Sequence, residues 1–304
     1  MIIAFIGFGE AGLAIATSLG RTEDDRPTLR AFDIKLADDD NDVAEAMARR
    51  ITDAGVEPAT SPAEAVGEAD IVISVVTADQ AATAAGLSAR HLPPGALYLD
   101  MNSCAPTTKQ IAASSVGPAG GIYVDVAVMA PIEPRGHETP MLAAASDPEA
   151  VAARLAAAGL LPRFVGDEIG RASTIKMLRS VMVKGIEALT AECFRAAVKA
   201  GVAEEVAGSL DASQPDMGWA EQAAYNMERM TAHGIRRAAE MREVAKTLRA
   251  LEVPPAMTTG TIAWQDDMGA LDLALSPDTA LADQIGLIEQ ALTSDKDSWD
   301  KQRI

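Results

Sequence analysis

The sequence contains few of the residues that bind metals or cross-link a chain. Its 304 residues include only two cysteines and three histidines. Cys104 and Cys193 form no Cys-x-x-Cys pair, and His91, His137 and His233 stand far apart. This spacing offers neither a metal-ligand motif nor a disulfide framework. We therefore expect no metal centre and a reducing compartment.

Excess positive charge and long apolar runs are also missing. The formal net charge is −18, which would repel nucleic acids and anionic membrane surfaces. Acidic residues crowd 38–42, where we expect a solvated loop. No apolar stretch approaches the ~18 residues that a spanning helix needs. Because apolar, strand-like residues follow Met1 at once, we expect no leader peptide. These features predict a soluble, cytoplasmic protein.

Aromatic residues make up only 4% of the chain, whereas alanine-rich runs are frequent. Alanine is the strongest helix former, so the composition favours extensive helix. The length permits one large domain or two ordinary ones.

A glycine-rich turn follows the first apolar run. Residues 2–6 favour a strand, and the helix formers of 13–19 come after the turn. In a strand–turn–helix, Gly7 permits the tight turn, Gly9 lets the backbone approach a pyrophosphate, and Gly12 lets the helix pack closely. The free N–H groups of the helix start would hold the phosphates. Dinucleotide binding is thus predicted for Gly7, Phe8, Gly9, Glu10, Ala11 and Gly12.

An acidic residue ends the second predicted strand, 27–33. Asp33 lies about 20 residues after the glycines, where a carboxylate accepts hydrogen bonds from the adenosine ribose. Its charge would repel the 2′-phosphate of NADP, so NAD is the expected cofactor. Lys35 leaves NADP open, and an ordinary turn aspartate is the alternative interpretation.

Strands and helices alternate through the first half of the sequence. Strands are predicted at 27–33, 70–77, 93–100, 121–128 and 161–165, and helices at 41–54 and 147–158. This alternation predicts a doubly wound parallel sheet. Ligands bind such sheets at the carboxyl ends of the strands, so Val76 and Thr77 should face the cofactor.

The second half reads as helical throughout. After a break at 166–170, a proline-free pattern predicts a helix over 172–200, which at 1.5 Å per residue is about 40 Å long. Further helices are predicted at 203–210, 218–231, 234–251, 256–268 and 280–293. The predicted fold is therefore α/β. An N-terminal Rossmann-type domain (1–167) precedes an all-α C-terminal domain (168–304), and the long helix joins them.

The order of these motifs resembles the β-hydroxyacid dehydrogenase family, which includes 3-hydroxyisobutyrate, tartronate semialdehyde and 6-phosphogluconate dehydrogenases. Asp100–Pro106 resembles the family's D-x-S-T-x-x-P segment, so Asn102 and Ser103 match the Ser-Thr pair near the nicotinamide. Gly170–Ser180 resembles G-x-G-x-x-x-K-x-x-x-N and places Lys176 at the catalytic lysine. The resemblance implies NAD-dependent interconversion of a β-hydroxyacid-like alcohol and its carbonyl. In that reaction Lys176 would be the acid/base, with a pKa lowered by burial.

Two departures from the family pattern concern the substrate. Met129-Ala-Pro131 stands where the family has Ser-Gly-Gly, and Ser180 replaces an asparagine. Both changes suggest a bulkier or less polar substrate. The following loop carries a possible carboxylate clamp, Arg135, although a solvated loop is the alternative there. The residues expected around the substrate are Ser103, Met129, Pro131, Arg135, His137, Arg179, Ser180, His233 and Glu240.

Other functions remain open on the same fold. Imine reductases often use an acid in place of the lysine, so Lys176 argues against that activity. The departures at Met129, Pro131 and Ser180 leave open a non-catalytic NAD-binding sensor or scaffold. From the resemblance and the apolar, helix-rich second half we expect a homodimer.

Overall fold

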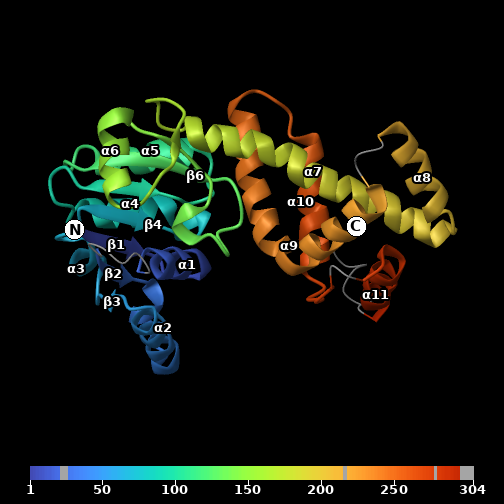
Figure 1. The fold of residues 1–304 in the computed structure, drawn as a ribbon, viewed down its shortest axis with the longest axis horizontal. Coiled ribbons are helices and arrows are strands. Elements are labelled where there is room, and N and C mark those ends of the chain that lie inside the picture. Colours follow the sequence, from blue (N-terminus) through green and yellow to red (C-terminus); the bar gives the residue numbers. More distant parts are fainter. Residues whose placement is uncertain (21–26, 215–217, 277–278, 295–304) are drawn as a thin grey trace. The chain divides into compact units, whose positions relative to one another are not determined.

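The computed structural model describes residues 1–20, 27–214, 218–276 and 279–294 (Figure 1). The chain folds into two compact units, Met1–Met177 (unit 1) and Leu178–Ile304 (unit 2). The domain boundary after residue 167 stays a prediction.

Unit 1 is built on an eight-stranded sheet with the order β3-β2-β1-β4-β5-β6-β7-β8. Neighbouring strands are parallel except for β6 and β7, which are antiparallel. The predicted Rossmann-type sheet is confirmed. The strands are β1 (Ile2–Ile6), β2 (Thr28–Phe32), β3 (Glu57–Pro58), β4 (Ile71–Ser74), β5 (Leu97–Asp100), β6 (Ile122–Val128), β7 (Met141–Ala144) and β8 (Arg163–Phe164).

Helices cover both faces of this sheet. One face packs against α1 (Glu10–Leu19), α2 (Asn41–Asp53) and α6 (Pro148–Ala157). The other packs against α3 (Pro62–Val66), α4 (Ala81–Ala89) and α5 (Pro106–Val116). Alternate strand residues belong to the two clusters because successive side chains of a strand point to opposite faces. Burial on both faces explains the nearly continuous apolar runs of the central strands. Unit 1 also contains the short 3₁₀ helices η1 (Ile34–Ala37), η2 (Ala78–Gln80) and η3 (Gly136–Glu138).

The secondary structure of the described residues of unit 2 is entirely helical, as predicted. Helix α7 (Arg171–Ala200), yellow-green in Figure 1, begins in unit 1 and continues into unit 2. It is followed by α8 (Ala203–Ser213), α9 (Trp219–Ala250), α10 (Ala256–Gly269) and α11 (Leu281–Ser294).

The two helices predicted at 218–231 and 234–251 are a single helix, α9, so that prediction was wrong. Gly234 does not break the helix but packs against α10. A Cβ at Gly234 would lie 2.7 Å from the backbone of Gly269, and a Cβ at Gly269 would lie 2.5 Å from the backbone of Ile235. The two glycines let the helices cross at backbone contact.

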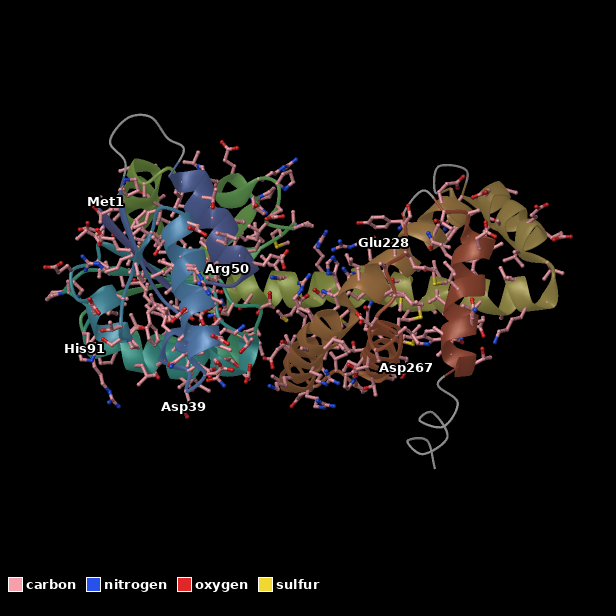
Figure 2. All side chains as sticks on the ribbon, turned by 90° about the horizontal axis from the view of Figure 1, so that it is seen from below. Met1, Asp39, Arg50, His91, Glu228 and Asp267 are labelled. Carbon is pink, nitrogen blue, oxygen red and sulfur yellow. The ribbon has the colours of Figure 1, made fainter. Side chains whose placement is uncertain are left out.

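Among residues 1–20, 27–214, 218–276 and 279–294, none of the helices combines the length and the apolar composition that a membrane span requires. The same ranges contain no group of three or more His, Cys, Asp or Glu side chains able to hold a metal ion. Figure 2 shows the labelled His91 and Asp39 at the periphery of unit 1, where both are exposed.

Candidate active site

The glycine turn between β1 and α1 has one glycine that faces open space. Gly7 has a φ of +89°, and a Cβ there would lie 2.7 Å from the carbonyl oxygen of Val75. A Cβ at Gly12 would lie 2.9 Å from the carbonyl oxygen of Gly7. A Cβ at Gly9, by contrast, would meet nothing within 4 Å. Gly9 is also the N-cap of α1 and provides no side-chain cap, so the turn combines space with N–H groups at a positive helix end.

Phe8 and Asp33 fix this turn to the sheet. The Phe8 side chain is fully buried and meets Phe5 edge to face, with ring centroids 5.9 Å apart. Its backbone N–H donates to Asp33 Oδ2 at 2.7 Å, while Asp33 Oδ1 accepts from the backbone N–H of Lys35 at 3.0 Å. Asp33 thus lies beside the glycine turn. A carboxylate has about four acceptor positions, so it retains capacity for ribose hydroxyls.

Other predicted cofactor residues follow strands or begin α1. Glu10 and Ala11 form the first turn of α1, and Glu10 is exposed. Val76 is half-buried after β4, whereas Thr77 is exposed. Asn102, after β5, is buried and donates through Nδ2 to Ser74 Oγ at 3.0 Å and Asp100 Oδ1 at 2.7 Å. Its Oδ1 atom has no hydrogen-bond partner in the described part of the chain.

Lys176 and Ser103 lie together in unit 1. The Nζ atom of Lys176, in the second turn of α7, donates a hydrogen bond to Ser103 Oγ at 2.6 Å. Both side chains are half-buried. Ser103 follows β5, whose carboxyl end shares an edge of the sheet with that of β1. The amine is therefore associated with the sheet edge that carries the glycine turn.

The sequence did not predict the buried ionisable cluster of Asp100, Lys109 and Asp125. Lys109 is fully buried, and its Nζ donates to the carbonyl oxygen of Asp100 at 2.5 Å and to Asp100 Oδ1 at 2.9 Å. It also lies 3.7 Å from Asp125 Oδ1. Burial alone would lower the pKa of Lys109, but the charges of Asp100 and Asp125 outweigh it and raise the pKa. Lys109 is therefore a buried cation.

Tyr123 and Ser173 add hydrogen bonds to one oxygen of each carboxylate, Asp100 Oδ2 and Asp125 Oδ2. The Tyr123 hydroxyl donates to Asp100 Oδ2 at 2.6 Å, and burial together with the Asp100 charge raises the Tyr123 pKa. Asp125 Oδ2 accepts from the N–H groups of Gly170 and Ser173, both at 3.1 Å, and from Ser173 Oγ at 3.3 Å. A signal was available, because Asp100 ends its predicted strand and Asp125 is an acidic residue inside a predicted strand that is otherwise mostly apolar.

The residues of the loop after β6 differ in their surroundings. Met129 packs against an apolar cluster that includes Ala172, the second residue of α7. Pro131 and Arg135 are exposed, and Arg135 has no ion pair with any described residue. The Nδ1 atom of His137 lies 2.8 Å from Ser18 Oγ, near the opposite end of α1 from Gly9. The predicted substrate contacts of these residues stay predictions.

The remaining predicted substrate residues lie in unit 2. Ser180 is buried, and Lys184 Nζ lies 3.4 Å from its Oγ atom and 2.8 Å from Glu240 Oε2. Arg179 is exposed. His233 is half-buried, and burial, followed by the charges of nearby arginines, lowers its pKa. Unit 2 therefore brings Ser180 and Glu240 together through Lys184.

Comparisons with known proteins assign a domain type to each half of the chain. Residues 2–154 match the family model described as the NAD binding domain of 6-phosphogluconate dehydrogenase. Residues 197–268 match a domain of unknown function, DUF1932.

Three solved structures are similar over most of their length. A conserved hypothetical protein from Sinorhizobium meliloti 1021 is 34% identical, with 96% of this chain and 97% of that chain covered and a TM-score of 0.77. A conserved protein described as structurally similar to 3-hydroxyacid dehydrogenases is 29% identical, with 89% and 97% covered and a TM-score of 0.69. The fold also matches Mycobacterium tuberculosis 3-hydroxyisobutyrate dehydrogenase at 17% identity, with 95% and 99% covered and a TM-score of 0.71.

The open space at Gly9, the helix terminus, Asp33 and the buried acceptor of Asn102 all fit a dinucleotide. Together with the family match over residues 2–154, they identify a Rossmann-type domain that binds NAD(P). With half of the chain matched by the family model, the protein belongs to the β-hydroxyacid dehydrogenase family, in its 6-phosphogluconate dehydrogenase-like branch.

Proposed function

We propose that the protein is an NAD-dependent dehydrogenase that interconverts an alcohol next to a carboxylate and the matching carbonyl. The 2.6 Å hydrogen bond from Lys176 to Ser103 carries this proposal. It associates a half-buried amine with the sheet edge where a dinucleotide is expected to bind. That pairing supplies a proton-transfer group where the cofactor's chemistry needs one.

The predicted site residues of unit 1 would each have a role in this reaction. NAD, when bound, would accept or donate the hydride. The backbone N–H groups of the turn at Gly9 would hold the pyrophosphate, and Asp33 would accept hydrogen bonds from the ribose. Lys176 would take the proton from the substrate hydroxyl at Nζ, or return it in the reductive direction. Ser103 orients the amine by accepting its hydrogen bond.

The substrate that best suits this chain is larger or less polar than a small hydroxyacid. Met129 contributes an apolar side chain where the family has a small polar one, and Ser180 is shorter than the family's asparagine. In this proposal Arg135, Arg179, His233 and Glu240 are candidates for binding the acid group. The homodimer is part of the proposal, and light scattering on the purified protein tests it.

Lys176→Met is the variant that tests the chemistry, because it keeps much of the side-chain volume and removes the amine. Lys199→Met, on the same helix, is the matched control. A thermal-shift screen of hydroxyacids with NAD selects the substrate, and NADH formation measures the rate. We expect Lys176→Met to lose about 10²- to 10⁴-fold in kcat, as is typical for an acid/base group, while NADH binding is retained. Lys199→Met should keep the wild-type rate.

Three results would contradict the proposal. Turnover of Lys176→Met at the wild-type rate would remove the lysine from the mechanism. A wild-type protein that binds NADH but converts neither hydroxyacids nor ketoacids would instead be a sensor or scaffold. Turnover of imines alone would assign the imine reductase reaction.

A further inference from the structure

Asp100, Lys109 and Asp125 form a buried triad in unit 1. All three side chains have no exposed surface. One ammonium group faces two carboxylates, at 2.9 Å from Asp100 Oδ1 and 3.7 Å from Asp125 Oδ1. Because buried ions are unfavourable unless their charges are compensated, the second carboxylate needs a further positive partner.

The N-terminus of α7 is that partner. Asp125 Oδ2 accepts hydrogen bonds from the N–H groups of Gly170 and Ser173, and these belong to the end of the helix where its dipole is positive. Asp125 thus caps α7 from a neighbouring strand. Lys176 lies three residues after Ser173, so the cap fixes the turn that precedes the amine.

Asp100 fixes the segment that carries Ser103, which accepts the hydrogen bond from Lys176. Its Oδ1 atom accepts hydrogen bonds from the backbone N–H of Asn102 at 2.9 Å and from Asn102 Nδ2 at 2.7 Å. Ser103 is the next residue. The loop that carries the acceptor hydroxyl is therefore held by the same triad.

Lys109 and the sheet register connect the two anchors. Asp100 and Asp125 are direct partners in the parallel pairing of β5 and β6, so their separation is set by the spacing of neighbouring strands, about 4.8 Å. Lys109 also donates to the carbonyl oxygen of Val126 at 3.3 Å. The Ser103 loop and the first turn of α7 are consequently attached to one rigid sheet through one cation.

We propose that Asp125 is a positioning residue for Lys176, and that the buried triad sets the distance between Lys176 Nζ and Ser103 Oγ. Its consequence for catalysis rests on the proposed function. Its consequence for the geometry does not, because the lysine can be observed without turnover.

The test observes Lys176 directly in the full-length protein with NADH added. Accessible lysines, the half-buried Lys176 included, are labelled by reductive ¹³C-methylation, and Lys176→Arg assigns the Lys176 resonance. Asp125→Ala removes both the cap and the charge, whereas Asp125→Asn keeps a side-chain oxygen that can cap a helix. Asp147→Ala is the matched control, because Asp147 caps α6 by accepting from the N–H of Ala150 at 3.1 Å.

In Asp125→Ala we expect the Lys176 resonance to move toward those of solvated lysines. The amides of Gly170 and Ser173 should exchange roughly tenfold faster or more, as expected when a helix end opens locally. Asp125→Asn should show a smaller change in the same direction. If the alanine variant does not fold, Asp125→Asn alone tests the positioning role. Once a substrate is known, kcat of Asp125→Ala should fall by roughly tenfold to a hundredfold, and KM for NAD should change less than kcat. Asp147→Ala should leave Lys176 unchanged.

The outcomes separate this proposal from the proposed function. If both Asp125 variants leave the Lys176 resonance and the exchange of Gly170 and Ser173 unchanged, the positioning role is overturned. An equal disturbance by Asp147→Ala would also overturn it, as a general loosening of unit 1. If Asp125 variants move Lys176 but the wild type converts no substrate, the positioning role stands and the proposed function fails.

Discussion

Gly7 and Gly9 lack a side chain for different reasons within one turn. At Gly7 the backbone has a φ of +89°, and a Cβ would lie 2.7 Å from a carbonyl oxygen. At Gly9 the φ and ψ angles of −72° and −153° are accessible to alanine, and a Cβ would meet nothing within 4 Å. Gly7→Ala should therefore damage the fold, whereas Gly9→Ala should damage only the binding of a ligand that occupies the open space.

The structure sets the size of each effect. The left-handed region costs a residue with a Cβ about 1–2 kcal/mol, and crowding against a backbone that cannot move adds about 1–3 kcal/mol. We expect Gly7→Ala to lower the free energy of unfolding by about 2–5 kcal/mol. Gly9→Ala should change it by less than about 0.5 kcal/mol. Its methyl group should weaken NADH binding about tenfold or more, which corresponds to at least about 1.4 kcal/mol.

Urea unfolding followed by circular dichroism measures the first quantity, and NADH fluorescence titration measures the second. Gly86→Ala in α4 is the control, because a Cβ there would have its nearest contact at 3.9 Å. It should leave NADH binding unchanged and raise stability slightly, since alanine favours a helix over glycine. The reasoning is refuted if Gly9→Ala binds NADH like the wild type, or loses as much stability as Gly7→Ala.

Three further predictions concern charge and packing. Asp33→Asn removes the carboxylate expected to repel the 2′-phosphate, so fluorescence titration should show the affinity for NADP rising relative to NAD; an unchanged ratio would argue against the ribose role. Gly234→Ala would force a Cβ into the backbone of α10, and urea unfolding should show a loss of about 1–3 kcal/mol, whereas unchanged stability would contradict the close crossing. Burial would raise the pKa of Glu289, but hydrogen bonds from Lys199 and Arg195 outweigh it and lower the pKa. The ionised carboxylate therefore stabilises the fold above the ordinary glutamate pKa and loses this contribution as pH falls through the lowered pKa. The stability difference between wild type and Glu289→Gln should shrink on acidification, and a difference independent of pH would rule out this linkage.

Structural features that depend on residues close together in the chain were predictable from the sequence. The glycine turn, the buried strands and the long helix with Lys176 each depend on residues close together in the chain. Strand β7 was not predicted, because Met141-Leu-Ala-Ala144 consists of good helix formers. Its pairing with β6 and its complete burial make it a strand.

Features that depend on distant partners were not predictable. Gly234 reads locally as a helix boundary, and only Gly269 explains why a glycine is needed within α9. Lys109 reads as a surface lysine of α5 until Asp100 and Asp125 are placed beside it. His137 stands in a candidate substrate loop, yet its hydrogen-bond partner, Ser18, is 119 residues away.

Phe8 has a consequence for how the cofactor arrives. Its buried ring and the hydrogen bond from its N–H to Asp33 hold the turn in one backbone conformation before any ligand is present. A site that is ordered in advance loses little binding free energy to its own ordering. NADH association should therefore be a single kinetic step, whose observed rate rises linearly with NADH concentration, and the glycine turn acts as a preformed receptor.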